Sequence, residues 1–304
     1  MNKTSTPPEI ALRPQLDLFP GFISDQTLAL LAPIIAYWTF STFFYLLDEM
    51  DLFAKYRIHP PAEVASRNKC SKLEVFRAVV LQHILQTATG LLLNKFEPAQ
   101  MTGHESYELW KISMRLNVSP AVAQAIYYLI MPAFRLFMGF FILDTWQYML
   151  HRAMHMNKFL YKHFHSVHHR LYVPYAFGAL YNSLVEGFLL DTVGAGLGYL
   201  LTGMSTRESI VFYTFSTLKT VDDHCGYDLP WDPLQILFPN KSVYHDIHHQ
   251  SFGIKTNFSQ PFFIHWDEIF NTKYKDTNNY IQEQKRQRKQ RYEEYLKKEH
   301  KKTK

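Results

Sequence analysis

A run of 21 consecutive residues without a charged side chain, residues 27–47, constrains the fold of this chain more than any other feature. At about 1.5 Å of rise per residue, a helix of this length spans the hydrocarbon core of a lipid bilayer. Such a run is unusually long for the interior of a water-soluble protein, where helices usually keep a polar face. We therefore expect a transmembrane helix here.

Three more apolar regions follow, at residues 73–93, 121–150 and 184–218. They contain polar residues, such as Gln82 in the first and Asp144 in the second, and inside a membrane these must face protein or water. The last region is 35 residues long and is interrupted by TGMSTRES, so it is short for two full spans and long for one. The pattern predicts an all-α integral membrane protein with about four transmembrane or re-entrant helical segments.

The positive charge of the chain is concentrated at its C-terminus. Residues 281–304 carry ten Lys or Arg and four Glu, a net charge of +6, and the whole chain carries +5, which leaves −1 for everything before this segment. The basic character therefore belongs to a tail and predicts no surface for nucleic acid. On a membrane protein, a basic tail favours the cytosolic side, where the lipid surface is anionic.

Histidines are concentrated in the second half of the chain. Eleven of the fifteen lie between residues 151 and 265, and eight of these form three clusters. The first cluster reads His-x-x-x-His, and the second and third, at 165–169 and 245–249, both read His-x-x-His-His. A further histidine stands alone in VDDHCGYDLPW. The nine candidate metal ligands are His151, His155, His165, His168, His169, His224, His245, His248 and His249.

Helical geometry explains these spacings, because residues i, i+3 and i+4 lie on one face of a helix. Each cluster is therefore predicted to direct its imidazoles at one point. Neutral imidazole is a common ligand for Fe, Zn, Cu and Ni, and nine ligands suit two metal ions with five or six ligands each. We interpret the other histidines as core or surface residues: His59, His83, His104, His163, His265 and His300.

Other cofactor motifs are missing from the sequence. There is no His-Glu-x-x-His, no Glu-x-x-His pair of a carboxylate di-iron bundle, and no glycine-rich phosphate loop in the context of a dinucleotide site. The two cysteines support neither a disulfide framework nor a cysteine-rich metal site. With no visible flavin or nicotinamide site, the chain must receive any electrons from a partner.

The histidine pattern on a multispan chain resembles the fatty acid hydroxylase/sterol desaturase superfamily. The segments LYVPYAFGALYNSLVEGFLLDTVG, KTVDDHCGYDLPWDP and VYHDIHHQSFGIKTNFSQPFF are most similar to its sphinganine C-4 hydroxylase branch of the fungal type, over about residues 135–275. Two departures are visible. Asn182-Ser183-Leu184 stands where many relatives read Asn-His-Pro, and Asn271 replaces a usual glycine, whose left-handed conformation Asn tolerates.

The resemblance implies a membrane-bound di-iron monooxygenase that uses O2. Its electrons would come from reduced cytochrome b5, which an NAD(P)H-dependent reductase supplies. Its substrate would be sphinganine or dihydroceramide, hydroxylated at C-4 to give the phytosphingosine-type bases of sphingolipid biosynthesis. The resemblance also implies the endoplasmic reticulum membrane, and the last four residues, KKTK, look like a dilysine retrieval signal on a cytosolic tail.

All histidine clusters must lie on one side of the membrane in order to meet. The chain between the clusters must therefore enter the membrane and come back to the same side. We expect a hairpin or re-entrant pair around Thr202–Ser209, with half-spans shorter than usual. The expected organisation is an N-terminal segment (1–26), membrane spans (27–134), a cytosolic histidine-rich helical catalytic domain (135–275) and a basic cytosolic tail (276–304).

Three acidic residues near the clusters, Asp222, Asp223 and Asp246, are candidate acceptors for the ring N–H groups of the ligand histidines. Two alternative functions remain open. One is a sterol-modifying member of the same superfamily, a C-4 methyl oxidase or C-5 desaturase. The other is a non-enzymatic histidine-rich metal transporter or sensor, although transporters tend to place ligands inside spans at the membrane midplane.

Overall fold

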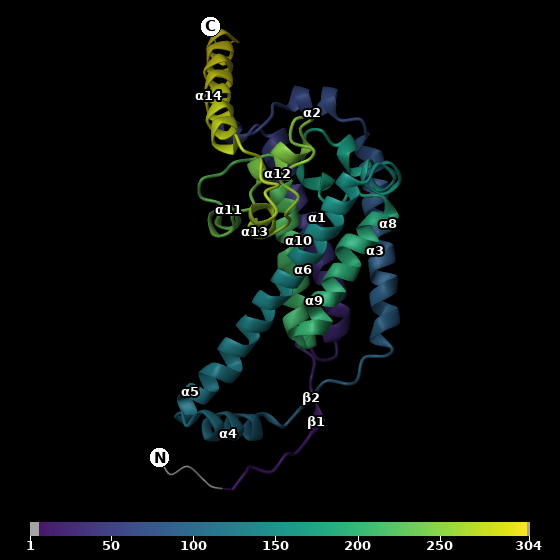
Figure 1. Ribbon diagram of the computed structural model, residues 1–304, viewed down its shortest axis with the longest axis vertical. Coiled ribbons are helices and arrows are strands. Elements are labelled where there is room, and N and C mark those ends of the chain that lie inside the picture. Colours follow the sequence, from purple (N-terminus) through teal and green to yellow (C-terminus); the bar gives the residue numbers. More distant parts are fainter. Residues whose placement is uncertain (1–5, 303–304) are drawn as a thin grey trace.

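The computed structural model describes the backbone of residues 6–302 and, in the last helix, side chains as far as residue 294 and at residue 297. Long helices run along the long axis of the molecule and alternate in direction (Figure 1). They are α1 (Asp25–Glu49), α3 (Lys72–Asn94), α6 (Met131–Met156), the continuous rod of α8 (Leu184–Gly187), η6 (Phe188–Val193) and α9 (Gly194–Thr202), and α10 (Thr206–Asp223). α1 packs most extensively on α10, and α6 on α9.

Shorter elements cover the two ends of this bundle. β1 pairs antiparallel with β2 at the end where α4 and α5 lie, whereas α2, α12 and α14 lie at the other end (Figure 1). The shorter elements are β1 (Arg13–Pro14), η1 (Ala54–Tyr56), α2 (Pro61–Arg67), β2 (Met101–Thr102), α4 (Glu105–Leu116), α5 (Pro120–Ala125), η2 (Ile126–Ile130), α7 (Lys158–Leu160), η3 (Tyr161–His165), η4 (His168–Arg170), η5 (Ala176–Gly178), α11 (Pro233–Leu237), α12 (Ser242–His249), α13 (His265–Ile269) and α14 (Thr277–Lys302).

Four helical segments of the described chain are long and apolar enough to cross a membrane: Asp25–Glu49, Lys72–Asn94, Pro120–Met156 and Leu184–Thr202. Large apolar side chains point outward from them, as expected for helices that face lipid rather than water. Examples are Ile35, Phe43, Leu81, Ile84, Leu129 and Phe134. The prediction of an all-α membrane protein with about four spanning segments is therefore confirmed.

The chain between the histidine clusters forms a helical hairpin, α9–α10. Gly203 ends α9 in the left-handed region at φ +63°, which a glycine adopts without steric cost. Ser205 and Glu208 then form a capping box that starts α10. The turn lies where the sequence predicted it. The expectation of short half-spans is wrong for the outgoing limb, because Leu184–Thr202 has 19 residues and is itself a candidate span.

Pro132 lies near the start of α6 without ending the helical rod. The five residues Ile126–Ile130, which end two positions before the proline, form a π-helical turn, and the chain stays helical from Pro120 to Met156. The missing amide hydrogen and the ring of a proline disturb the regular ladder, and a wider turn is a common way to accommodate such a disturbance.

A buried cluster joins the spans to the histidine-bearing segment. It packs Tyr37 and Phe44 of α1 and Val79 of α3 against Leu171 and Tyr181, which follow the second histidine cluster. The Tyr37 hydroxyl donates to the Phe177 carbonyl at 2.7 Å. The loops that carry the histidines are thereby fixed on one end of the bundle.

The basic tail forms the helix α14, and its first half contacts the same end of the molecule. Arg288 pairs with Asp228 at 2.7 Å, and the Tyr280 hydroxyl donates to Asp246 at 2.7 Å. The KKTK sequence at its end lies outside the described side chains. The contacts hold the start of the tail against the face that carries the histidines.

Candidate metal centre

All nine histidines singled out by their spacing are buried at one end of the bundle, each with a relative exposure of 8% or less. They form two groups, and within each group one nitrogen of every ring lies within 4.8 Å of the corresponding nitrogens of the others. The first group contains five histidines: His151, His155, His165, His169 and His248. The second contains four: His168, His224, His245 and His249.

The groups cut across the two His-x-x-His-His clusters. His165 and His169 enter the first group while His168 enters the second, and His245 and His249 enter the second group while His248 enters the first. The prediction that each cluster aims at one point is therefore wrong for these two clusters, and it holds for His151 and His155, which both lie in the first group. On a helix, residues i and i+4 are only about 40° apart, but i+3 and i+4 are about 100° apart, so neighbouring rings diverge. Each of the two His-x-x-His-His clusters therefore contributes two rings to one group and one ring to the other.

Short and irregular helices set these directions. His151 and His155 lie one turn apart near the end of α6, and His245, His248 and His249 lie on α12. The middle cluster does not lie on a regular α-helix. His165 ends the π-helical η3 and His168 begins the 3₁₀-helical η4, which adjusts their separation. His224 caps the C-terminus of α10.

Main-chain carbonyl oxygens orient five of the nine rings. In each case Nδ1 lies 2.7 to 3.0 Å from a carbonyl, so Nδ1 carries the hydrogen and Nε2 keeps a free lone pair. The pairs are His151 with Phe258, His168 with Tyr181, His224 with Thr220, His248 with Thr256 and His249 with Leu171.

A sixth ring is oriented by a carboxylate. Glu186, at the start of the fourth spanning segment, lies 2.5 Å from Nδ1 of His165, and both side chains are 1% exposed. Ser183 caps this helix by accepting the Glu186 amide. Ser183 thus helps to hold the carboxylate. Sequence reasoning missed Glu186, because it lies outside the histidine clusters and far along the chain from its partner.

The Nε2 atoms face one another inside each group. Distances between them are 2.7 to 3.2 Å in the first group and 3.0 Å in the second. Where the Nδ1 atoms hold the hydrogens, these contacts bring lone pairs together in a buried space, which is unfavourable unless a cation lies among them. The donor set of five and four imidazoles therefore fits two metal ions.

Burial keeps these imidazoles neutral. It lowers the pKa of His168 to about 4 and, with repulsion from His168, that of His224 to about 3. Burial and the neighbouring histidines also lower the pKa values of His165, His169 and His245 well below the usual range. Neutral imidazole is the form that binds a metal, so the rings are prepared for it at neutral pH.

The three acidic residues expected to accept from the ligand rings are buried but bind other groups. Asp222 accepts from Gln235 at 3.1 Å, and Asp223 pairs with Lys219, which is fully buried. Asp246 contacts His59 at 2.9 Å. Among the hydrogen bonds described for the nine histidines, the acceptors are main-chain carbonyls and Glu186 instead. His163, set aside from its spacing, is exposed and contacts the Phe159 carbonyl.

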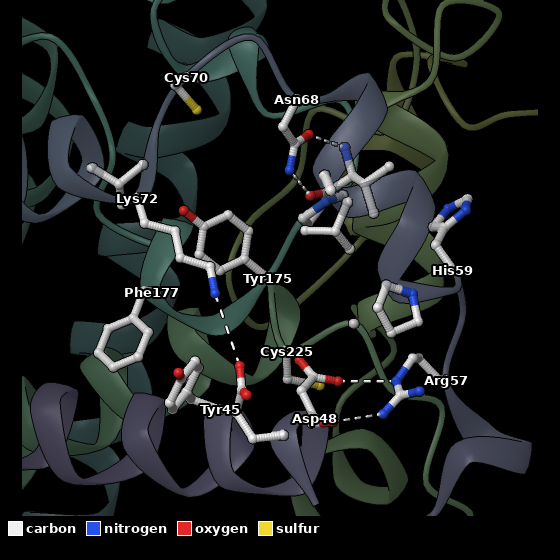
Figure 2. A pocket seen from close by; sticks show the side chains of 18 of the residues that line it. Tyr45, Asp48, Arg57, His59, Asn68, Cys70, Lys72, Tyr175, Phe177 and Cys225 are labelled. Carbon is white, nitrogen blue, oxygen red and sulfur yellow. Dashed lines mark hydrogen bonds and ion pairs between the residues drawn. The ribbon is translucent and has the colours of Figure 1, made fainter. Parts of the chain in front are cut away.

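A cavity of about 720 Å³ opens beside the centre, between the ends of α1 and α3 and the 173–177 loop (Figure 2). Its wall is aromatic, with Tyr45, Tyr175 and Phe177 labelled in the view, and none of the nine histidines lines it. Its charged groups pair with one another: Arg57 with Asp48 at 2.9 Å, and Lys72 with Glu49 at 3.9 Å. It is therefore an amphiphilic pocket without an unpaired charge for a ligand.

The fold and this site define an integral membrane protein with a buried, nitrogen-rich centre. A family model described as fatty acid hydroxylase matches residues 136–272. The chain is 55% identical to the sphingolipid C4-hydroxylase of Saccharomyces cerevisiae, over 95% of this chain and 83% of that protein. It is 47% identical to the Schizosaccharomyces pombe protein of the same name, over 81% and 87% of the two chains.

A plant relative extends this pattern. Sphinganine C4-monooxygenase 2 of Arabidopsis thaliana is 44% identical over 82% of this chain and 88% of its own length. No solved structure matches the chain. The chain therefore belongs to the fatty acid hydroxylase family, and it is a membrane-bound hydroxylase of the monooxygenase type.

Proposed function

We propose that this enzyme hydroxylates C-4 of sphinganine or dihydroceramide to give phytosphingosine-type bases. The observation that carries the proposal is the pair of buried histidine groups at the end of a bundle of membrane-spanning helices. The relatives that are 44 to 55% identical over more than four fifths of the chain are named for C4 hydroxylation, whereas two rice proteins that are 42% identical are named very-long-chain aldehyde decarbonylase. A methylsterol monooxygenase matches only 42% of the chain, which supports C4 hydroxylation over a sterol modification. Membership of a hydroxylase family argues against the alternative of a metal transporter or sensor.

Two iron ions are the proposed cofactor, held by His151, His155, His165, His169 and His248 and by His168, His224, His245 and His249. When bound, such a pair would supply the activation of O2 that side chains alone cannot perform, so that one oxygen atom is inserted into an unactivated C–H bond and the other leaves as water, with two electrons and two protons consumed. The electrons would come from reduced cytochrome b5 and its NAD(P)H-dependent reductase, since the sequence contains no flavin or nicotinamide motif.

The protein's own contribution is to orient the ligands and exclude water. In six of the nine rings a main-chain carbonyl or Glu186 holds the hydrogen on Nδ1, so that Nε2 faces the interior. The centre lies where the spans end, and a long-chain base keeps its polar head at that level of a membrane and its chain below. C-4 is only a few bonds from the head, so a buried groove can present it to the centre.

We propose the endoplasmic reticulum membrane as the location, with the histidine-bearing end of the catalytic domain (135–275) and the C-terminus on the cytosolic side. The domain is not cytosolic throughout, because it includes the end of the span Pro120–Met156 and all of the span Leu184–Thr202. The basic residues of 281–304 support this orientation, because Lys and Arg favour the cytosolic side of a membrane. Reduced cytochrome b5 would then reach the centre from the cytosolic face.

The test is the variant His168→Ala, expressed in cells whose own C-4 hydroxylase gene is deleted. Loss of one ligand from the second group should abolish 4-hydroxylated bases, measured by mass spectrometry of total long-chain bases. The matched control is His163→Ala in the same segment, because His163 is exposed and lies outside both groups. Unchanged 4-hydroxylation in His168→Ala would contradict the proposal, as would wild-type protein that alters sterols and leaves the long-chain bases unmodified.

A further inference from the structure

Two cavities meet inside the bundle. One, of about 20 Å³, is lined by four of the nine histidines and has room for about one small polar group. The other, of about 180 Å³, lies between α1, α3, α9 and α10 at membrane depth. Gln147, Asp191 and Thr220 line both. These three residues therefore form a polar junction between the membrane interior and the metal centre.

The larger cavity suits a hydrocarbon chain. Most of the residues that line it come from the spans, and its aliphatic wall includes Leu30, Ile34, Leu93, Leu143, Leu180 and Ala195. A lipid in this cavity would place its methylene groups against the aliphatic wall, because burying them lowers the free energy. Its polar end would then lie at the junction.

Asp191 holds the junction together from the fourth span. Its Oδ2 accepts from Gln82 of α3 at 2.7 Å, and its Oδ1 accepts from Gln147 of α6 at 3.0 Å. Each oxygen thus receives one amide hydrogen. A carboxylate has about four acceptor positions, so Asp191 can accept further hydrogen bonds from a ligand in either cavity.

The carboxyl group of Asp191 has no cationic partner in the described chain. Within residues 6–302 with described side chains, no Lys, Arg or His forms an ion pair with Asp191. Its two donors are neutral amides. A charged side chain inside a span is costly and normally pairs with an opposite charge, so the junction suits a cation.

We infer that Asp191 binds the ammonium group of the substrate, and that the enzyme prefers the free long-chain base to its N-acylated form. This inference rests on the proposed function. In sphinganine the amino group is on C-2, two bonds from C-4, so a carboxylate that fixes the nitrogen also fixes the reacting carbon. Asp191 is therefore a positioning residue.

Thr220 connects this site to the metal ligands. It lines both cavities, and its carbonyl accepts the Nδ1 hydrogen of His224 at 2.9 Å. One turn of α10 thus borders the ammonium site and orients a ligand of the second group. The helix α10 alone therefore fixes the position of the bound lipid head group relative to the second histidine group.

The experiment compares sphinganine, which carries the ammonium group, with N-acetylsphinganine, which does not. In the purified, metal-loaded enzyme, wild type should show a higher kcat/KM for sphinganine. In Asp191→Asn the kcat/KM for sphinganine should fall by about 10- to 100-fold, the effect of losing a charge-assisted hydrogen bond, and that for the amide should change little. The ratio of the two values is the readout.

Gln82→Met is the matched control. It removes one donor to the same carboxylate, but Gln82 is not among the residues that line either cavity. If Asp191 only stabilised the helix packing, both variants would lower the two kcat/KM values in parallel. The inference requires that Gln82→Met keep the preference for the free base and that Asp191→Asn lose it.

The outcomes separate this inference from the proposed function. C-4 hydroxylation without a preference for the free base in wild type would overturn the inference alone, even if Asp191→Asn failed to accumulate. A preference that survives in Asp191→Asn would do the same. Failure of wild type to hydroxylate either lipid at C-4 would overturn the proposed function first.

Discussion

Single residues decide which nitrogen of each imidazole is free. Five of the nine rings are oriented by main-chain carbonyls, which no side-chain substitution removes. Among the acceptors described for these rings, Glu186 is the one side chain that orients a ring, by accepting the hydrogen on Nδ1 of His165. It is therefore the position at which the orientation of a ligand can be changed without changing the ligand itself.

Replacing Glu186 by Leu should lower metal content or hydroxylation by about 10- to 100-fold, the usual effect of removing an acceptor behind a ligating histidine. Glu186→Gln keeps an acceptor oxygen at the same distance, so it should restore much of the loss. Metal analysis of the purified protein and the rate of 4-hydroxylation are the two measurements. Full metal content and full activity in the Leu variant would show that His165 needs no acceptor.

A second residue-level contact ties α2 to the third histidine cluster. His59 lies between Asp246, at 2.9 Å, and Glu63, at 3.1 Å. Burial alone would lower the pKa of His59, but the two carboxylates outweigh burial and the repulsion from Arg67, and the pKa is raised above 6.5. The folded state therefore binds this proton more tightly than the unfolded state does.

The sign of the pH effect follows from that shift. The contribution of His59 to stability is fully present below pH 6.5 and is lost as the pH rises through its folded-state pKa. The difference in melting temperature between wild type and His59→Gln in detergent should thus be larger at pH 6 than at about pH 9. A difference that grows with pH would contradict this assignment.

At the scale of elements, the α9–α10 hairpin brings the third cluster and His224 back to the first two. Its turn depends on the positive φ of Gly203 and on the capping box of Ser205 and Glu208. Glu208 also pairs with Arg135 of α6 at 2.6 Å. One side chain therefore starts the returning helix and attaches it to a neighbouring span.

Gly203→Ala should destabilise the protein by about 1 kcal/mol, because a Cβ disfavours the left-handed conformation by about 1–2 kcal/mol. Gly196→Ala is the matched control on the same rod, since an added Cβ there meets no atom within 4 Å and the backbone is helical. It should be neutral or stabilising in the same thermal unfolding measurement. Equal losses in both variants would show that the turn conformation is not what matters.

At the scale of the whole molecule, the two ends of the bundle should lie on opposite sides of the membrane. α4 lies at one end, and α2, α12 and α14 lie at the other (Figure 1). Between α4 and α14 the chain passes through two candidate spans, Pro120–Met156 and Leu184–Thr202, and then returns along the bundle through α10. With three passages between them, a group on α4 and a group on α14 should differ in their access to reagents.

The test uses single cysteines at Arg115 of α4 and Arg286 of α14, both exposed positions, in sealed microsomes. A membrane-impermeant maleimide should label Arg286→Cys directly and Arg115→Cys only after detergent is added. Wild type gives the background from Cys70 and Cys225, of which the second is buried. Labelling of both variants without detergent would contradict the proposed topology.

Spacing alone identified the histidines, because repeated i, i+3 and i+4 intervals are local and visible in the sequence. It did not show that neighbouring rings in a cluster serve different groups, since that depends on how three elements approach one another. The carbonyl of Leu171, which orients the distant His249, has no side-chain signal at all. The roles of Glu186 and Asp191 could not be predicted either, because both residues lie inside an apolar segment and their partners are distant in the sequence.

The rod from Pro120 to Met156 contains 37 residues, which corresponds to about 56 Å, whereas the hydrocarbon layer is about 30 Å thick. Such a rod must lean or overhang, and the lean follows the thickness of the bilayer. Its last two turns carry His151 and His155, so the depth of these two proposed ligands in the membrane depends on that angle. The thickness of the surrounding bilayer thereby influences where His151 and His155 lie relative to the other histidines.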